Sequence, residues 1–453
     1  MTIRGNPGTS HGLTGLCVIG IGQDVFRWYF EFATPQGRWE SAMRLDALIF
    51  GGGAAGLWLL DRLSRDGHHV LLLEARSLGS GQTVASQGII HGGLKYTLSG
   101  LLTKSAKNIR EMPNVWRDSL LGKSTPNLTR TRVRSDCCYL WQTDSLTSRA
   151  GMIGARIGLR IKPETISMDE RPDALNGVYG TVARLPEQVI SPQSFIQDLA
   201  NQYHDRILKI DADKGLEFDL DSPGEVKSVR LVSPTDGSTL MLNPRQVIFT
   251  AGGGNARLRK RTGLSSDVMQ RRPLHMVVVR GHQLPELNGH CLDGAKTRVT
   301  ITSQMDSQGR MVWQVGGQVA EDGVKLDPGA LTEHAWGELL SVLPGVDLRD
   351  TEWTTYSTDR AEGATANGSR PETIQVLCAG NVTTGWPTKL VLAPVLANEI
   401  ASRATSPYVS APFDTTPFAA WPRPSVATLP WEEEGHHWWK LGEAPALPRR
   451  RAA

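Results

Sequence analysis

The chain has 453 residues, in which 49 lysines and arginines nearly balance 46 aspartates and glutamates, for a formal net charge of +3. This balance gives no sign of nucleic acid or of an anionic membrane surface as a partner. No apolar run approaches the roughly 18 residues that would span a bilayer, and the length is enough for about two or three domains.

The five cysteines are odd in number and form no CxxC pair: Cys17, Cys137, Cys138, Cys291 and Cys378. No histidine cluster stands at zinc spacing, so we predict neither a disulfide framework nor a bound metal. Free thiols fit a reducing compartment, and we therefore predict a cytoplasmic protein.

Residues 1–43 precede the first predicted strand of the chain. Their longest apolar run, Leu16 to Gly22, has no basic flank and no small-residue cleavage site, so a signal peptide is not predicted. We predict that these residues form a disordered extension and that the functional chain begins near Met43.

Residues 45–74 contain a strand, a glycine turn, a helix and a second strand in succession. The apolar run 45–50 leads directly into Gly-Gly-Gly-Ala-Ala-Gly at 51–56. Leucines at positions 59, 60 and 63 continue one face of a helix, and the apolar run 70–73 predicts a second buried strand. Glu74 closes that strand.

This order predicts a dinucleotide-binding unit. Gly51 permits the tight turn, Gly53 lets the backbone approach a pyrophosphate, and Gly56 lets the helix pack close to the strand. The helix N-terminus offers N–H groups and a partial positive charge to the phosphates. Glu74 is placed to accept a hydrogen bond from a ribose hydroxyl, and its charge disfavours a 2′-phosphate. The alternative is a unit that packs in this way without a nucleotide.

The next segment carries a more specific signal. Residues 78–88 are small, polar and glycine-rich, and Ile-Ile-His-Gly-Gly-Leu-Lys-Tyr follows at 89–96. The stretch 51–96 resembles the N-terminal region of the FAD-dependent oxidoreductases of the D-amino-acid-oxidase superfamily. It is most similar to glycerol-3-phosphate dehydrogenases, which carry Ile-His-Gly-Gly-Leu-Arg-Tyr, and to L-2-hydroxyglutarate oxidases, which carry a related Ile-His-Ala-Gly.

The resemblance implies FAD as the cofactor and a loop whose backbone N–H groups, at Ser86, Gln87 and Gly88, lie near the flavin ring. It implies that His91 lies beside the flavin or the substrate; a structural histidine bonded to backbone is the alternative. Glycerol-3-phosphate dehydrogenases have Arg and Lys before this histidine segment, where the present chain has Val-Ala-Ser-Gln-Gly at 84–88. Glycerol 3-phosphate is therefore disfavoured as the substrate.

The middle of the chain alternates between the two predicted domains. A polar helix is predicted within 101–134 and a strand at 137–141. Ser191 followed by Pro192 predicts a helix start, in a segment that resembles the superfamily's return to the cofactor domain. Strands are predicted at 207–210, 216–220 and 226–232.

A strand at 245–249 runs into three glycines, Gly252 to Gly254, which in the superfamily pass beneath the cofactor; an ordinary turn is the alternative. Residues 273–343 predict a β-rich segment that covers the flavin, with a hairpin turn at 306–309. Its candidates for polar contacts are His275, Arg280, His282, His290 and Arg298.

The last informative stretch begins with a predicted buried strand at 374–381 that contains Gly380. A helix is predicted from near Thr388, and the resemblance implies that its N-terminus faces the flavin, with Lys389 adding a full positive charge. Arg360 falls where relatives often place an active-site arginine, and we predict that it clamps a substrate carboxylate. The alternative for Arg360 is a surface salt bridge to Asp359 or Glu362.

We therefore predict an α/β fold: a Rossmann-like FAD-binding domain with an interleaved β-rich (α+β) substrate domain. The predicted division is 1–43 extension; 44–134, 185–271 and 353–405 FAD-binding domain; 135–184 and 272–352 substrate domain; and 406–453 a loosely docked or disordered tail. The predicted catalytic residues are His91, Arg360 and Lys389. The predicted cofactor-binding residues are Gly51, Gly53, Ala54, Ala55, Gly56, Glu74, Ala75, Ser86, Gln87, Gly88, Gly252, Gly380 and Lys389.

The predicted function is oxidation of a small substrate at a C–H next to a hydroxyl or amine, by hydride transfer to the flavin. Electrons then pass to oxygen or another acceptor. Two alternatives stay open: a non-catalytic FAD-binding protein, and a flavin monooxygenase that uses NAD(P)H.

Overall fold

The computed structural model describes residues 42–92, 104–143, 164–293, 296–408 and 411–443. The predicted extension, up to residue 41, and Lys95 and Tyr96 of the histidine segment lie outside these ranges. None of the helices within them has the length and apolar character needed to cross a lipid bilayer.

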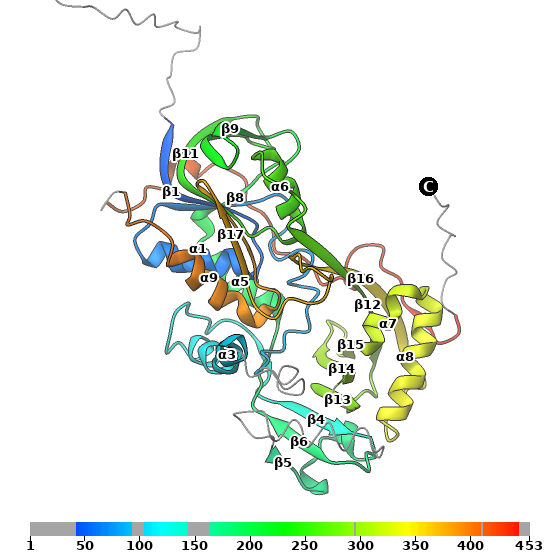
Figure 1. Cartoon of the computed structure of the whole chain (residues 1–453). Coiled ribbons are helices and arrows are strands. Elements are labelled where there is room, and N and C mark those ends of the chain that lie inside the picture. The colour runs from blue at the N-terminus through cyan, green and yellow to red at the C-terminus, as the bar shows by residue number, and fades with distance from the viewer. Residues whose placement is uncertain (1–41, 93–103, 144–163, 294–295, 409–410, 444–453) are drawn as a thin grey trace, which may run out of the picture. The chain divides into compact units, whose positions relative to one another are not determined.

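The first sheet is mostly parallel and is built around β1, the strand that leads into the glycine turn (Figure 1). β1 pairs in parallel with β2 on one side and β11 on the other, and β9 and β10 extend the sheet in antiparallel fashion from β11. The strands are β1 (Met43–Phe50), β2 (Val70–Glu74), β8 (Ile207–Lys209), β9 (Leu216–Ser222), β10 (Glu225–Val232), β11 (Thr239–Phe249), β17 (Gln375–Ala379) and β18 (Val382–Trp386).

Alternate residues of β1 enter two different cores. Ala47 and Ile49 pack with the helices that cover one face of the sheet, whereas Leu48 and Phe50 pack against β9 and β10 on the other face. The covering helices are α1 (Ala54–Arg65), α3 (Lys104–Leu120), α5 (Pro192–Gln202) and α9 (Ala393–Ala401). Both faces are therefore buried, as expected for parallel strands of a nearly continuous apolar sequence.

The second sheet has nine strands, and it is mixed. Its order is β19-β16-β12-β15-β14-β13-β4-β6-β5, with β13 and β4 parallel. The strands are β4 (Cys138–Gln142), β5 (Glu164–Thr165), β6 (Val182–Leu185), β12 (Met269–Gly281), β13 (Gly289–Asp293), β14 (Lys296–Met305), β15 (Met311–Gly317), β16 (Glu352–Gly363) and β19 (Trp439–Lys440). A separate pair joins β3 (Val133–Ser135) to β7 (Val189–Ile190).

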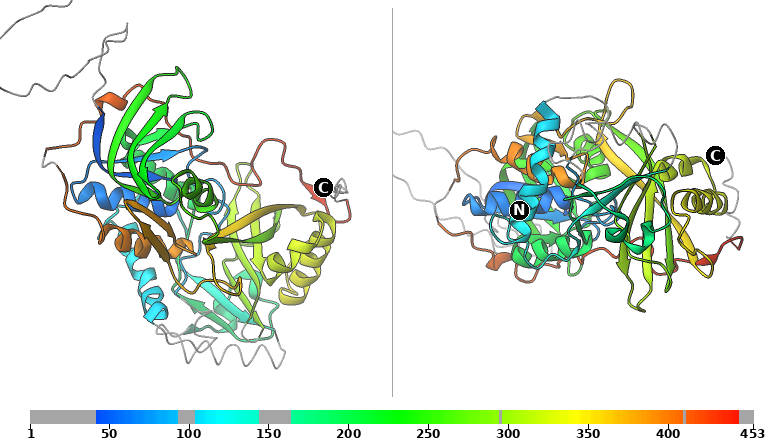
Figure 2. Two further views of the ribbon diagram at one scale, coloured as in Figure 1. Left: turned by 45° about the horizontal axis from the view of Figure 1, so that its top comes forward. Right: turned by 90° about the horizontal axis from the view of Figure 1, so that it is seen from below.

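Helix α8 (Pro328–Val342) lies along one side of this second sheet, as the left view of Figure 2 shows in yellow. Leu331, Ala335 and Leu339 of α8 share a core with the buried Trp313 and Trp353 of the sheet. The short helices α6 (Asn255–Arg261) and α7 (Gln318–Asp322) complete the α-helices of the described ranges, which also contain single 3-10 turns such as Leu390–Leu392. The sequence predicted a β-rich segment over 273–343 and did not indicate α7 and α8, which lie within it.

Several predicted elements are confirmed at close to their predicted positions. The helix at Ser191 starts as expected, because the Ser191 hydroxyl accepts a hydrogen bond from the Ser194 amide and Pro192 occupies the first turn. The strands near 207, 216, 226 and 276 are present as β8, β9, β10 and β12.

Two predicted boundaries are wrong. β16 pairs with β12 along its whole length, so residues 353–363 belong to the second sheet and not to the cofactor domain. The tail after residue 405 is not loose where it is described. Phe418 and Trp421 enter the core of the first sheet, Trp431 packs near Tyr356, and β19 pairs with β16. Isolated aromatic residues, without any periodicity, provide this burial.

The packing predicts that Phe418→Ala destabilises the protein although it lies in the predicted tail. The side chain is 0 % exposed, and truncating a buried Phe costs about 3–5 kcal/mol. Denaturant unfolding followed by tryptophan fluorescence measures the change. Tyr179→Ala is the control, because that aromatic side chain is 92 % exposed. Equal stability of the two variants would contradict docking of the tail.

Candidate active site

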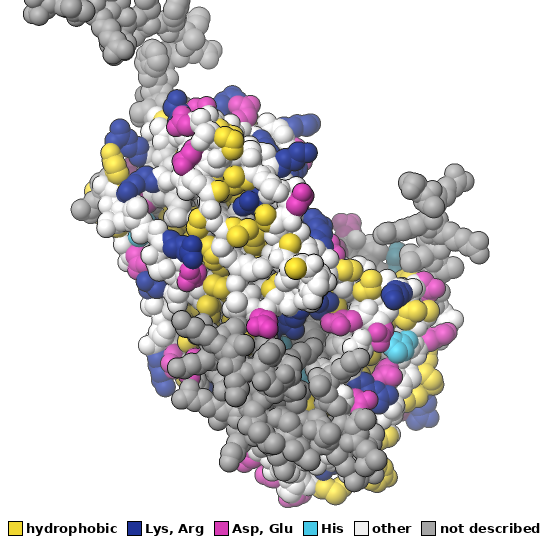
Figure 3. Space-filling view, viewed as in Figure 1, with side chains coloured by type: hydrophobic (Ala, Val, Ile, Leu, Met, Phe, Trp, Pro, Cys, Tyr) yellow, Lys and Arg dark blue, Asp and Glu magenta, His cyan; other side chains and the backbone are white. Residues whose placement is uncertain are grey.

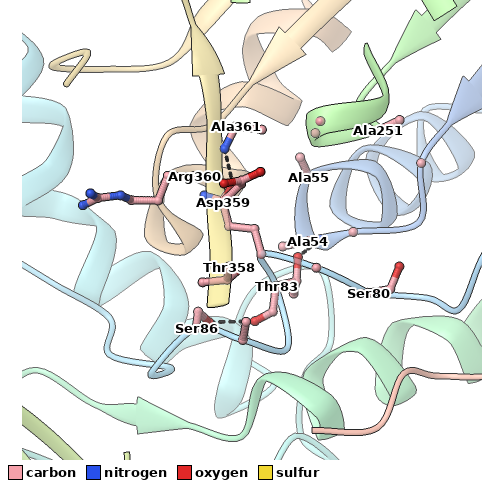
Figure 4. Close-up of a pocket in the computed structure, with 18 of the residues that line it drawn as sticks. Ala54, Ala55, Ser80, Thr83, Ser86, Ala251, Thr358, Asp359, Arg360 and Ala361 are labelled. Atoms are coloured by element: carbon pink, nitrogen blue, oxygen red, sulfur yellow. Dashed lines mark hydrogen bonds between the residues drawn. The ribbon is translucent and has the colours of Figure 1, made fainter. Parts of the chain in front are cut away.

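A cavity of about 1140 Å³ lies where the glycine turn, the 78–91 loop and strand β16 meet. The sequence-predicted residues Gly51, Gly53, Ala54, Ala55, Glu74, Ala75, Ser86, Gln87, Gly88, His91, Gly252, Arg360 and Lys389 all line it. Figure 4 shows how Ala54, Thr83 and Ala361 approach one another from three segments distant in sequence. The fold thus brings together most of the residues that the sequence identified separately.

The glycine turn needs glycine at two places for steric reasons. Gly51 has φ +107°, and a Cβ there would lie 2.5 Å from Cα of Ala251 on the neighbouring segment. A Cβ on Gly56 would lie 2.0 Å from the carbonyl oxygen of Gly51. Gly56 does not line the cavity, and its place in the structure fits the predicted role of close helix–strand packing.

Gly53 precedes the first residue of α1 and has an open side. The nearest atom to a Cβ there would be the Thr83 hydroxyl oxygen, at 3.2 Å. The same hydroxyl accepts a hydrogen bond from the Ala54 amide at 3.3 Å. The first turn of α1 carries no acidic residue, so its positive end is not neutralised and suits a diphosphate.

Glu74 is held rigidly at the edge of the cavity. One carboxylate oxygen accepts from the Gly52 amide at 2.7 Å, and the other accepts from the Arg76 amide at 2.7 Å. Each oxygen keeps a further lone pair, so the carboxylate can still accept hydrogen bonds from ribose hydroxyls. This arrangement fits the predicted role.

The 78–91 loop is fastened to the second sheet through Gln87. Its amide nitrogen donates to the carbonyl oxygens of Thr300, at 3.1 Å, and Gln314, at 2.8 Å. Within the loop the Ser86 hydroxyl donates to the carbonyl of Thr83, as drawn in Figure 4. The prediction concerned the backbone N–H groups of this loop; the clamp made by the Gln87 side chain was not expected.

Gly252 lines the cavity with φ +55° just after β11. Gly380 does not. It occupies the turn between β17 and β18, where a Cβ would lie 2.4 Å from the carbonyl oxygen of Gly224. The prediction that Gly380 binds cofactor is therefore corrected: β17 is a partly exposed strand, and the buried strand that leads to the cavity is β18.

Lys389 reaches the cavity from the segment after β18. The preceding Thr388 is buried and has φ +60°, a conformation that costs energy for a residue other than glycine. The helix that follows starts later than predicted, with a single turn at Leu390–Leu392 and then α9. Strained backbone held by surrounding structure is common at functional sites.

His91 lies on the cavity wall beside two residues from other segments. Its Nδ1 is 3.7 Å from a carboxylate oxygen of Glu187, and its ring centroid is 5.3 Å from that of His290. Glu187 and His290 are both buried. Glu187 lies shortly before Ser191, in the segment whose resemblance to the superfamily indicated only a return to the cofactor domain.

Arg360 lines the cavity, but its charge is already paired. A guanidinium nitrogen lies 3.0 Å from a carboxylate oxygen of Glu321, a partner that the sequence did not suggest. In Figure 4 the side chain extends away from Ala54, Thr83 and Ala361. Burial lowers the pKa of Arg360 from its usual value, and the positive charge of Arg272 acts in the same direction. Asp359 and Glu362 pair with Arg271 and Arg272 instead.

Sequence reasoning also missed Gln82, whose side-chain oxygen accepts from the Ala361 amide at 3.0 Å and so links the loop to β16. The only available signal was its position in the glycine-rich loop.

The described cavity lining is more basic than acidic, with eight lysines and arginines against five acids. The basic residues are Arg76, Lys209, Arg257, Arg261, Arg271, Arg360, Arg370 and Lys389. The acidic residues are Glu74, Asp211, Asp213, Glu321 and Asp359. By contrast, basic and acidic side chains are interspersed on the face shown in Figure 3.

A glycine turn, an uncompensated helix N-terminus, a fixed acid and a basic cavity together define the class: an α/β protein that seats a dinucleotide diphosphate on its first helix. The chain belongs to the family of FAD-dependent oxidoreductases called DAO, whose model matches residues 46–393.

The comparisons with individual proteins agree with this assignment. The chain is 38% identical over 395 residues to a probable FAD-dependent oxidoreductase of Pseudomonas aeruginosa, PA4991, covering 86% of this chain and 98% of that protein. The PA4991 crystal structure gives a TM-score of 0.72 at 35% identity, with the same coverage of both chains.

More distant structures share the fold. Glycine oxidase from Geobacillus kaustophilus gives a TM-score of 0.56 at 18% identity, over 83% of this chain and 98% of that one. L-α-Glycerophosphate oxidase from Mycoplasma pneumoniae, with FAD bound, gives 0.58 at 14% identity, over 82% and 97%. The predicted family, the fold class, the FAD cofactor and the oxidoreductase activity are thus confirmed.

The turn geometry predicts that Gly51→Ala impairs FAD binding. A side chain at this positive φ costs about 1–3 kcal/mol from backbone strain alone. If all of this falls on the bound state, FAD affinity drops roughly 5- to 150-fold. FAD content after gel filtration and titration of the apoprotein measure the effect. Gly337→Ala on α8 is the control, since no atom lies within 4 Å of a Cβ there. Unchanged affinity in Gly51→Ala would contradict the assigned seat.

Proposed function

We propose that this protein oxidises a small substrate at a carbon that bears a hydroxyl or amino group. When bound, FAD supplies the hydride acceptor, and it passes the electrons on to oxygen or to another acceptor. The observation that carries the proposal is the position of His91: it lines the same cavity as the glycine turn, the 84–88 loop segment and Lys389.

His91 is the proposed base for the hydroxyl or amine proton. A general base must come within hydrogen-bond reach of the proton that it takes. His91 is about a third exposed, so one side of its ring remains accessible from the cavity. Glu187 and His290 lie beside the ring of His91.

Lys389 is the proposed source of positive charge beside the reduced cofactor, which would carry negative charge after accepting the hydride. It stands just before the helical turn Leu390–Leu392 that leads into α9. A cation and a helix N-terminus placed together stabilise an anion more than either one alone.

Arg360 is the proposed partner of a substrate carboxylate. It already binds one carboxylate, that of Glu321, at 3.0 Å. A substrate anion would replace this contact, and the side chain of Glu321 is partly exposed. The basic lining of the cavity favours an anionic substrate in the same way. The 84–88 segment, which carries no cation, gives no support to a phosphate at that particular place.

An NAD(P)H-dependent monooxygenase is the competing function, and one experiment separates the two. The purified holoprotein is mixed under anaerobic conditions with 2-hydroxy acids, amino acids, NADH or NADPH, and its absorbance near the flavin maximum is followed. We expect bleaching by a hydroxy acid or an amino acid. Bleaching by NADH or NADPH alone would indicate the monooxygenase, and no bleaching by any hydroxy acid or amino acid would contradict the proposed substrate class.

Replacing the proposed base predicts a kinetic loss without loss of cofactor. His91→Gln should lower the rate of flavin reduction by the best substrate about 10²- to 10⁴-fold, the usual contribution of a general base. Stopped-flow absorbance measures this rate, and FAD content is checked in parallel. His282→Gln, at an exposed loop position, is the matched control and should reduce at the wild-type rate. A His91→Gln variant that also reduces at that rate would remove His91 from the mechanism.

A further inference from the structure

Three side chains that could bind a metal ion converge at one wall of the cavity. His91 comes from the end of the 78–91 loop, Glu187 from the connection between β6 and β7, and His290 from β13. One ligand atom from each lies within 4.8 Å of the others. No two of these residues are near in sequence, so the cluster exists only in the folded chain.

Glu187 gives the strongest indication that a cation belongs here. Its residue is 4 % exposed. One carboxylate oxygen accepts from the Gly92 amide at 2.5 Å, while the other is buried and has no hydrogen-bond partner among the described residues. A buried carboxylate oxygen is costly unless it is paired or coordinates a metal.

The distance from this oxygen to His91 suits a shared ion. It is 3.7 Å to Nδ1 of His91, which is longer than a hydrogen bond. Two ligands on one tetrahedral zinc ion, each bound at roughly 2.0–2.2 Å, stand about 3.4 Å apart. The widest separation in the cluster would have to close by on the order of 1 Å to reach that value, a change that small side-chain rotations provide.

His290 is already oriented for such a role. Its Nδ1 lies 2.9 Å from the Thr300 hydroxyl oxygen, a contact that fixes the ring. Metal-binding histidines commonly hold their second ring nitrogen in this way, and metal-binding carboxylates are themselves hydrogen-bonded, as Glu187 is to Gly92.

We propose that His91, Glu187 and His290 form a binding site for a divalent transition-metal ion, with Zn²⁺ as its representative. Two imidazoles and one carboxylate are a donor set that Zn²⁺ favours, whereas Mg²⁺ and Ca²⁺ favour oxygen ligands alone. His91 and His290 line the cavity, so a bound ion sits at its wall. A neutral imidazole has one nitrogen lone pair, so a metal ion bound to His91 leaves no lone pair to accept a proton, and the ion therefore inhibits the proposed base.

Metal binding is tested without any substrate, so the result is independent of the proposed function. The full-length holoprotein is stripped with a chelator, freed of it by gel filtration and titrated with Zn²⁺ by calorimetry. Bound zinc is then counted by elemental analysis. We expect one Zn²⁺ per chain at micromolar or lower concentration, and no displacement by millimolar Mg²⁺. Glu187→Gln and His290→Gln should each weaken binding by at least about tenfold, while His282→Gln should bind as wild type.

FAD content and melting temperature are measured first for each variant. If either substitution at the cluster loses FAD, Thr300→Val replaces it, because this change removes only the hydroxyl that orients His290; we expect an affinity loss of about tenfold or more. The proposal is overturned if the wild type takes up no stoichiometric zinc, or if Mg²⁺ competes equally. Variants of the cluster that bind zinc as tightly as the wild type would also overturn it.

Discussion

The approach of three backbone segments at Gly51 is the constraint on which the rest of the structure depends. The turn after β1, the segment after β11 and the first helix come closer there than any side chain would allow. Because the contacts are between main-chain atoms, the cofactor seat is formed by backbone geometry and depends little on the chemistry of neighbouring side chains. The fixed Glu74 and the open side of Gly53 have the geometry that dinucleotide recognition requires.

The 78–91 loop meets a second structural requirement, because its hydrogen bonds connect the glycine turn to the second sheet. Gln87 bonds to two carbonyl oxygens of the second sheet, and the Ala85 carbonyl accepts from both Gln314 and Tyr356 at 2.8 Å. Buried polar contacts of this kind are costly when only partly satisfied and fix one arrangement when complete. The loop therefore keeps the residues of the substrate side, including His290, at a defined distance from the glycine turn.

What the sequence predicted well has strong local causes. The βαβ unit around Gly51 follows from its apolar periodicity and from glycines at the positions where this turn leaves no room for a side chain. The helix at Ser191 follows from its N-terminal cap. The failures arose where the cause is distant in the chain. Gly380 was misassigned because a hairpin turn and a cofactor turn both need glycine, and only the pairing of β17 with β18 separates them.

The candidate site shows the same difference between features with a local cause and features that depend on distant parts of the chain. His91 was found from a motif, but its neighbours Glu187 and His290 are brought to it by tertiary structure alone, and the pairing of Arg360 with Glu321 has no sequence signature. The polar strand β16 was assigned to the wrong domain because its partner β12 was not known.

The buried aromatic residues after residue 405 affect how the chain folds during its synthesis. Phe418 and Trp421 complete one face of the first sheet, and Trp431 and β19 complete parts of the second. Since a ribosome releases these residues after the other strands of both sheets, neither hydrophobic interior is complete until they have emerged. The nascent chain therefore carries two incomplete cores until that point, and exposed apolar surface during this interval favours aggregation.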